Sequence, residues 1–251
     1  ALSSEPELVQ RAAGVHVPRL AQAALSPSTT PRFAGAHLLT GGTGGLGLVT
    51  AGWVASSGAS ALVLASRRGA LSQSASQLVN CGAKVRLVSC DGAVAVELAQ
   101  VFAQTTSEAL PPLRGVWHAA GVLADGMLRS QTAAMLRRVY GAKAHGAWAL
   151  QRGAATTPLQ CCALFSSVAA LLGSAGQANY AAANSCLDAL AGARRGAALS
   201  GVSVQWGPWA EVGMAAGGAV HARLQAAGWG LIGRAEGLAA LGLAVGPSAP
   251  P

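Results

Sequence analysis

Short apolar runs alternate with helical stretches along most of this chain, and that alternation limits the folds it can adopt. Six runs are predicted as strands, and they cover residues 36–40, 60–65, 84–89, 115–119, 161–166 and 201–206. The run Ala61–Leu64 is apolar at every position, as expected for a strand that helices cover on both faces. Strands that alternate with helices in this way form a parallel sheet. The sequence therefore predicts an α/β fold, a Rossmann-like doubly wound parallel sheet with helices on both faces.

Length and composition favour one domain. The 251 residues are enough for a large single core, and the 52% hydrophobic and 10% charged content is far from that of a disordered chain. Residues 1–34 contain several prolines, serines and threonines, and we expect a linker or the remnant of a preceding unit there. The chain has no initiating Met, no secretory signal and no apolar run of membrane-spanning length, so we expect a soluble segment of a longer cytoplasmic or organellar protein.

The cysteines and the charge do not indicate a metal or nucleic-acid site. The five cysteines form no C-x-x-C pair, so we expect reduced, buried side chains and no metal. The formal charge of +8 could attract acidic proteins or polyphosphate, or could reflect composition bias. No basic run with interleaved aromatic residues predicts nucleic-acid binding.

A glycine-rich turn follows the first predicted strand and opens a helix. Glycines allow a tight turn and let backbone N–H groups approach a pyrophosphate, which the positive end of the following helix also attracts. The turn therefore predicts a dinucleotide site rather than a purely structural turn. Its candidate contacts are Gly41, Thr43, Gly44, Gly45, Leu46 and Gly47.

The end of the second strand bears on the choice of nucleotide. An NAD-binding protein often has an acidic residue there for the ribose hydroxyls, whereas this chain has Ser66 and Arg67. These side chains suit a 2′-phosphate, which favours NADPH over NADH. The alternative is that the arginines at this strand end are simply solvated.

Two further strand ends supply candidate contacts. Asp91 follows the third strand and is placed either to accept from an adenine amino group or to cap a helix. After the fourth strand, the small residues Ala119, Ala120 and Gly121 would lie beside a bound cofactor. We interpret His118 as a hydrogen-bonded residue at a strand end rather than as a catalytic base.

Tyr180 and Asn184 are the centre of the candidate catalytic set. If residues 177–195 form a helix, the two side chains share one face. Ser167 directly follows the fifth predicted strand, and Lys143 lies in a helix predicted over residues 133–150. A hydroxyl donor, a second hydroxyl and a lysine are what protonation of a carbonyl requires. The chain has only two tyrosines and two lysines, so random placement would rarely assemble this set.

Taken together, these motifs resemble the ketoreductase domains of type I polyketide synthases and fatty acid synthases, within the short-chain dehydrogenase/reductase superfamily. The resemblance covers residues 36–246, so that residues 35–251 would form an NADPH-binding catalytic ketoreductase domain. Most short-chain dehydrogenases have Tyr-x-x-x-Lys with an upstream Asn, whereas here Asn184 follows Tyr180 and Lys143 lies upstream, as in the synthase ketoreductases. The motifs that carry the resemblance are Thr40–Gly47, Ser66–Gly69, His118–Leu123, Lys143–Gly146, Phe165–Ala169, Gly176–Asn184 and Trp206–Trp209.

The resemblance implies a role for each member of the set. Tyr180 would protonate the substrate oxygen as hydride arrives, and Ser167 would hydrogen-bond the same oxygen. Lys143 would lower the pKa of Tyr180 and contact the nicotinamide ribose, and Asn184 would hold Lys143 and a relay water. Pro208 would contact the cofactor. The substrate would be a β-ketoacyl thioester on the phosphopantetheine arm of an acyl carrier protein, with neighbouring synthase domains as further partners.

The resemblance bears on stereochemistry and leaves two alternatives open. Leu123–Asp125 retains the second Asp of the Leu-Asp-Asp motif of B-type ketoreductases, and Leu172 replaces the Trp of A-type domains. Both features favour a D-configured 3-hydroxyacyl product. A closing strand is not evident after Val245, and only His16–Leu20 could remain from the family's preceding half-domain. The alternatives are a catalytically idle cofactor-binding module of a megasynthase and a free-standing short-chain carbonyl reductase.

Overall fold

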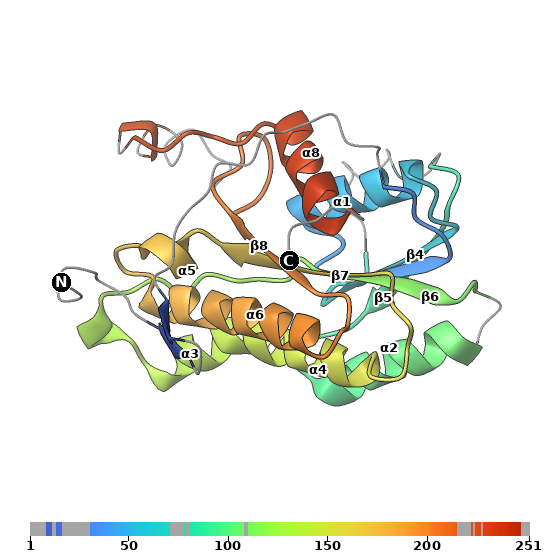
Figure 1. Cartoon of the computed structure of the whole chain (residues 1–251), viewed down its shortest axis with the longest axis horizontal. Coiled ribbons are helices and arrows are strands. Elements are labelled where there is room, and N and C mark those ends of the chain that lie inside the picture. The colour runs from blue at the N-terminus through green and yellow to red at the C-terminus, as the bar shows by residue number, and fades with distance from the viewer. Residues whose placement is uncertain are drawn as a thin grey trace.

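A parallel sheet with the strand order β5-β4-β3-β6-β7-β8 forms the centre of the computed structural model (Figure 1). The structure describes residues 9–11, 14–16, 31–70, 78, 81–107, 110–214, 222, 224–226 and 228–246. The strands of this sheet are β3 (Ala36–Thr40), β4 (Ala61–Ser66), β5 (Lys84–Ser89), β6 (Leu113–His118), β7 (Cys161–Ser167) and β8 (Val202–Trp206). Every strand pair in it is parallel, which confirms the predicted doubly wound α/β fold.

Helices cover both faces of the sheet (Figure 1). On one face lie α1 (Gly45–Ser56) and α8 (Arg234–Val245), and on the other lie α2 (Ala95–Ser107), α4 (Gly146–Gly153) and α6 (Ala178–Gly196). Consecutive strand residues point to opposite faces, so Leu38 packs on the α2 side and Leu39 on the α1 side. Both leucines are fully buried, and each such burial contributes about 1.5–3 kcal/mol of hydrophobic free energy.

The observed elements agree closely with the predicted ranges except in one helix. The predicted helix over residues 133–150 is three consecutive segments: α3 (Ala133–Tyr140), the π-helical turn η4 (Gly141–His145) and α4. The N–H of Gly146 bonds to the carbonyl of Gly141, five residues back, which widens the helix at this point. Apolar periodicity does not reveal such a turn, and it is where Lys143 lies. Two further short helical segments are η3 (Leu128–Ser130) and α5 (Ala169–Leu172).

The sheet edges and the N-terminal segment complete the architecture. β5 and β8 are the edge strands, and half of the residues of β5 are exposed. In the segment expected to be irregular, β1 (Val9–Arg11) pairs antiparallel with β2 (Gly14–His16). The expected family remnant lies outside the described residues except for His16, and so do the last five residues of the chain.

The cysteine prediction was only partly correct. Cys90, Cys161 and Cys162 are buried, and all five thiols are free, as expected. Cys186 is exposed and Cys81 is half-buried, contrary to the prediction. Cys186 lies on α6 two positions after Asn184, and this rotation along the helix places it on the solvent side while Asn184 faces the core.

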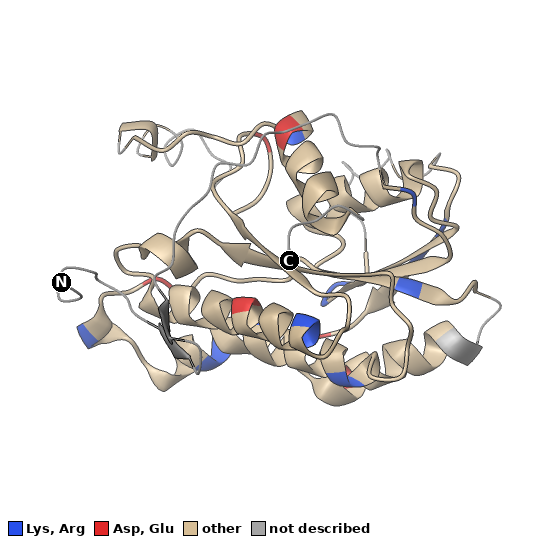
Figure 2. Cartoon of the chain, viewed as in Figure 1, with Lys and Arg blue, Asp and Glu red and all other residues tan. Residues whose placement is uncertain are grey.

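Charge is spread over the molecule rather than gathered on one element. Figure 2 shows Lys and Arg residues on several helices, and strands β5 and β6 carry them too. Within the described ranges, no group of His, Cys, Asp and Glu side chains is arranged to hold a metal. The same part of the chain contains no helix that is both long enough and apolar enough to cross a bilayer.

Candidate active site

The candidate site lies where the winding of the sheet reverses. From β3 the chain proceeds outward to β4 and β5, and then returns to β6 on the other side of β3. In open α/β sheets, ligands bind at this switch point, beside the carboxyl ends of the strands. The glycine turn follows β3, and Ala119–Gly121 follows β6, so both segments flank the switch point.

The glycine turn is packed so closely that side chains would not fit. Gly41 has φ +67°, and a Cβ there would lie 2.7 Å from the backbone N of Ala120. A Cβ on Gly47 would lie 2.2 Å from the carbonyl oxygen of Gly41. The following helix begins after Gly44, an extended N-cap residue that makes no side-chain capping bond. Free backbone donors at the start of α1 and the narrow glycine cradle fit a nucleotide pyrophosphate.

The neighbouring strand ends adjoin this turn. The N–H of Gly42 bonds to the carbonyl of Ala65, which places Ser66 beside the turn, and Arg67 is exposed. The N–H of Cys90 bonds to the carbonyl of Ser66, so Asp91 lies at the same edge of the sheet. Asp91 caps the loop before α2, because its Oδ1 accepts from the N–H of Ala93 at 3.0 Å. Because α2 begins only at Ala95, this bond closes a turn ahead of the helix and is not an N-cap of α2.

Tyr180 and Asn184 face inward from the first turns of α6. Tyr180 is 7% exposed, and Asn184 is fully buried. The side-chain amide of Asn184 donates to the carbonyl of Tyr180 at 2.8 Å, while its Oδ1 has no hydrogen-bond partner in the described part of the chain. Burial raises the pKa of the Tyr180 phenol, whereas hydrogen bonds with Asn184 and Ser167 lower it. One face of α6 thus carries the Tyr180 phenol and the unpaired Asn184 Oδ1. The Ser167 hydroxyl at the end of β7 lies beside the phenol.

Lys143 reaches this group from the π-helical turn η4. Its Nζ donates to the carbonyl of Phe165 on β7 at 2.5 Å and lies 5.6 Å from the centre of the Tyr180 ring. Lys143 is 3% exposed, and burial lowers its pKa from the ordinary 10.5 to about 7, while Asp188 on α6 opposes that shift. A side chain on Gly121 would come within 2.7 Å of Lys143 Cε. The small residue after β6 therefore leaves room for the lysine.

The segment after β8 lies close to the same site. Val212 and Gly213 pack against Gly45 at the start of α1, and the methyl group of Met214 faces Gly121. Pro208 accepts a backbone hydrogen bond from Ile232, which fixes the strand end. The predicted catalytic and cofactor residues thus come together around the carboxyl ends of the strands.

Thr40 and the carbonyl of Phe165 were given no role in the sequence analysis. The Thr40 hydroxyl bonds to His118, and Phe165 accepts the Lys143 ammonium group. A backbone acceptor has no sequence signature, because every residue type carries one. The position of Thr40 does give a weak sequence indication of a role, since it is the last residue before the glycine turn.

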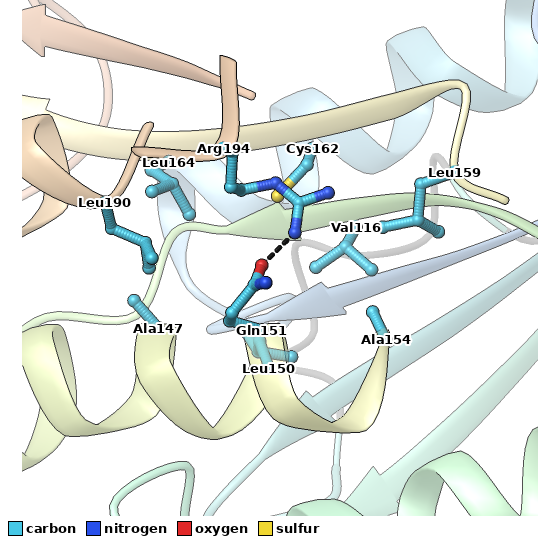
Figure 3. A pocket seen from close by; sticks show the side chains of 10 residues that line it. All are labelled: Val116, Ala147, Leu150, Gln151, Ala154, Leu159, Cys162, Leu164, Leu190 and Arg194. Carbon is cyan, nitrogen blue, oxygen red and sulfur yellow. Dashed lines mark hydrogen bonds between the residues drawn. The ribbon is translucent and has the colours of Figure 1, made fainter. Parts of the chain in front are cut away.

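Two hollows in the described part of the chain lie away from this site. Figure 3 shows a cavity of about 10 Å³ under α4 and α6, where Arg194 reaches across to Gln151 beside Cys162. That volume holds about one water molecule. A hollow of about 480 Å³ lies at the amino end of β6, next to Arg114 and Pro158. This hollow lies at the amino ends of the strands, whereas Tyr180 lies near their carboxyl ends.

Fold and site together define a short-chain dehydrogenase/reductase, a class that uses nicotinamide cofactors. The chain matches the family model of the KR domain over residues 35–211. It belongs to this family, the ketoreductase domains of polyketide synthases.

Related proteins and solved structures agree with this assignment. The chain is 41% identical to polyketide synthase GfsB of Streptomyces halstedii over 235 residues, which cover 91% of this chain and 4% of that protein. It is 45% identical over 184 residues to a Mycobacterium tuberculosis phenolphthiocerol synthesis polyketide synthase that is named as inactive, covering 71% of this chain and 11% of that protein. A structure of A-type ketoreductases from a modular polyketide synthase superimposes with a TM-score of 0.89 at 40% identity, over 97% of this chain and 53% of the solved chain. The chain thus spans a small part of these curated relatives and about half of the solved structure.

Proposed function

We propose that this domain reduces a β-ketoacyl thioester, carried by an acyl carrier protein, to the 3-hydroxyacyl thioester with NADPH. The reaction would belong to polyketide or fatty acid biosynthesis. The observation that carries the proposal is the convergence of Tyr180, Ser167 and Lys143 beside the glycine turn. Membership of the KR family supports the reaction class.

Each side chain has a chemical task in this proposal. The cofactor supplies hydride to the substrate carbonyl carbon. Tyr180 gives its phenolic proton to the carbonyl oxygen, and the Ser167 hydroxyl stabilises the negative charge that develops there. Protonated Lys143 favours loss of the phenolic proton through its positive charge and orients the ribose.

Asn184 completes the proton path in the proposal. Its Oδ1 is buried and has no hydrogen-bond partner among the described residues, an arrangement that is unfavourable by about 1–3 kcal/mol unless a donor satisfies it. A water molecule beside Tyr180 and Lys143 is the donor that fits. That water would return a proton to Tyr180 after each turnover.

Arg67 is the proposed determinant of NADPH preference. Its guanidinium group is exposed at the end of β4, beside the glycine turn. We expect Arg67→Ala to raise the Km for NADPH about tenfold or more and to leave the Km for NADH unchanged, because only the 2′-phosphate loses a charged partner. Steady-state kinetics with both nucleotides measures this effect. Arg152→Ala, at an exposed position on α4, is the matched control, and an equal loss with both nucleotides would contradict the assignment.

Product stereochemistry stays a separate prediction. The N–H of Gly126 bonds to the carbonyl of Gly176, and Asp125 accepts from the Gln177 side chain at 3.1 Å. The Leu123–Asp125 segment therefore lies at the start of α6, and in this proposal it would border the substrate path to Tyr180. We propose B-type reduction to the D-configured alcohol, although the solved relatives include A-type and C2-type ketoreductases. We also propose that residues 35–251 form the catalytic domain and residues 1–34 join it to a preceding unit.

One assay separates the proposed function from its alternatives. NADPH oxidation is followed with a carrier-bound β-ketoacyl thioester and, in parallel, with a small cyclic ketone, and the alcohol is analysed on a chiral column. We expect turnover of the thioester and a D-configured product. Nucleotide binding without turnover would instead support an idle module, and preference for the cyclic ketone would support a free-standing carbonyl reductase.

A further inference from the structure

His118 lies between the cofactor turn and the catalytic lysine. It is the last residue of β6 and is fully buried. Its ring contacts Thr40, which ends β3 next to Gly41, and the backbone of Lys143 in η4. None of the roles proposed above uses this side chain, although it touches both halves of the site.

The hydrogen bonds fix which nitrogen of His118 carries the proton. Nε2 lies 2.9 Å from the carbonyl oxygen of Lys143, which can only accept, so Nε2 is the protonated nitrogen. Nδ1 is then an acceptor, and the Thr40 hydroxyl donates to it at 2.6 Å. Burial and the nearby Lys143 lower the pKa of His118 to about 4, so the ring is neutral near neutral pH. The Lys143 carbonyl thus sets the tautomer, and Thr40 satisfies the other ring nitrogen and orients the imidazole.

The local geometry shows why Lys143 needs an anchor. It lies in the middle of the π-helical turn, where the backbone departs from regular α-helical bonding. The ring reaches this turn because Gly146 has no side chain, and a Cβ there would lie 3.0 Å from His118 Cε1. Lys143 is therefore held at both ends, by His118 at its carbonyl and by Phe165 at its ammonium group.

We propose that His118 is a positioning residue that, oriented by Thr40, holds Lys143 in register with the cofactor turn and Tyr180. This inference rests on the proposed reductase function. The carbonyl of Thr40 also accepts from the N–H of Ala119 at 3.0 Å, so the same residue ties β3 to the strand end that flanks the cofactor. The hydrogen bonds from Thr40 to His118 and from His118 to Lys143 thus connect the cofactor turn to the residue that carries the catalytic ammonium group.

Substitution of Thr40 tests the proposal without removing the imidazole. In the full-length protein, Thr40→Val keeps the shape of the side chain but leaves Nδ1 without a donor, so the ring loses one of the two hydrogen bonds that orient it. We expect kcat for the β-ketoacyl thioester to fall about tenfold or more, with the dissociation constant of NADPH within about twofold of wild type. Thr40→Ser restores the hydroxyl and should recover most of kcat. Thr105→Val, at another buried threonine on α2, is the matched control.

Imidazole nitrogen NMR supplies a readout that does not depend on turnover. We expect His118 of the wild type to show a proton on Nε2 and none on Nδ1, and we expect the Nδ1 resonance to shift in Thr40→Val because that nitrogen loses its donor. The proposal is wrong if the wild-type proton lies on Nδ1, if Thr40→Val keeps wild-type kcat, or if Thr40→Ser is as impaired as Thr40→Val. If the wild type itself lacks turnover, the proposed function fails, while the NMR comparison still decides whether His118 donates to Lys143 and accepts from Thr40.

Discussion

Tyr180→Phe should abolish measurable reduction of a β-ketoacyl thioester while leaving nucleotide binding intact. The substitution removes only the phenolic oxygen, which is the group proposed to protonate the substrate. Loss of a general acid typically lowers the rate by about 10²–10⁴-fold. The ring itself packs against Val139, Ala169 and Ala183, and Phe keeps those contacts. We therefore expect a folded protein that binds NADPH and does not oxidise it.

The other tyrosine provides the control. Tyr140 lies at the end of α3, is half-buried and has been assigned no part in the reaction. Tyr140→Phe removes the same atom and should keep kcat close to the wild-type value. Turnover by Tyr180→Phe at the wild-type rate would refute the role of Tyr180 and, with it, the proposed mechanism.

Lys143→Met should make the protein inactive and more stable. Methionine has about the length of lysine but no charge, so the phenol loses its cationic neighbour, and we expect kcat to fall about 10²-fold or more. Burial lowers the pKa of Lys143 to about 7, which means that folding keeps an ionisable group in an environment that disfavours its charge. The variant removes that penalty but leaves the Phe165 carbonyl without its donor, which is unfavourable by about 1–3 kcal/mol. Near pH 7 we expect a net gain of about 2 kcal/mol in the free energy of unfolding.

The sign of the pH dependence follows from the lowered pKa. Between about pH 7 and the ordinary value of 10.5, Lys143 is neutral in the folded protein and protonated in the unfolded chain. Unfolding then takes up a proton, so this group makes the wild type more stable as pH rises, by about 1.4 kcal/mol per pH unit. The stability advantage of Lys143→Met should therefore shrink as pH rises through this range.

Denaturant unfolding of both proteins across the range measures this difference, and contributions from other groups cancel in the comparison. Lys84→Met is the matched control, because Lys84 is exposed on the edge strand β5 and its removal should change neither kcat nor the pH slope. A stability difference between wild type and Lys143→Met that stays constant with pH would show that Lys143 has an ordinary pKa. Full activity of Lys143→Met would remove it from the catalytic set.

Much of the fold is encoded in local patterns. The strands β3 to β8 were predicted to within about two residues at each end, a margin normal for strand ends, because a run of apolar residues between turn residues is legible without knowledge of the tertiary structure. The glycine turn was legible for the same reason, since Gly41 and Gly47 serve the geometry of one short segment. Tyr180 and Asn184 were placed together by helical spacing alone.

The sequence by itself determined the doubly wound sheet, the cofactor turn and the types of residue available for the reaction. Only the tertiary structure decided how Lys143 reaches Tyr180, because the two come from separate helices and the π-helical turn has no periodic signature. Packing also decided the lowered pKa of Lys143 and the protonated nitrogen of His118. Desolvation and hydrogen-bond partners arise from residues distant in the chain, so no local pattern specifies them.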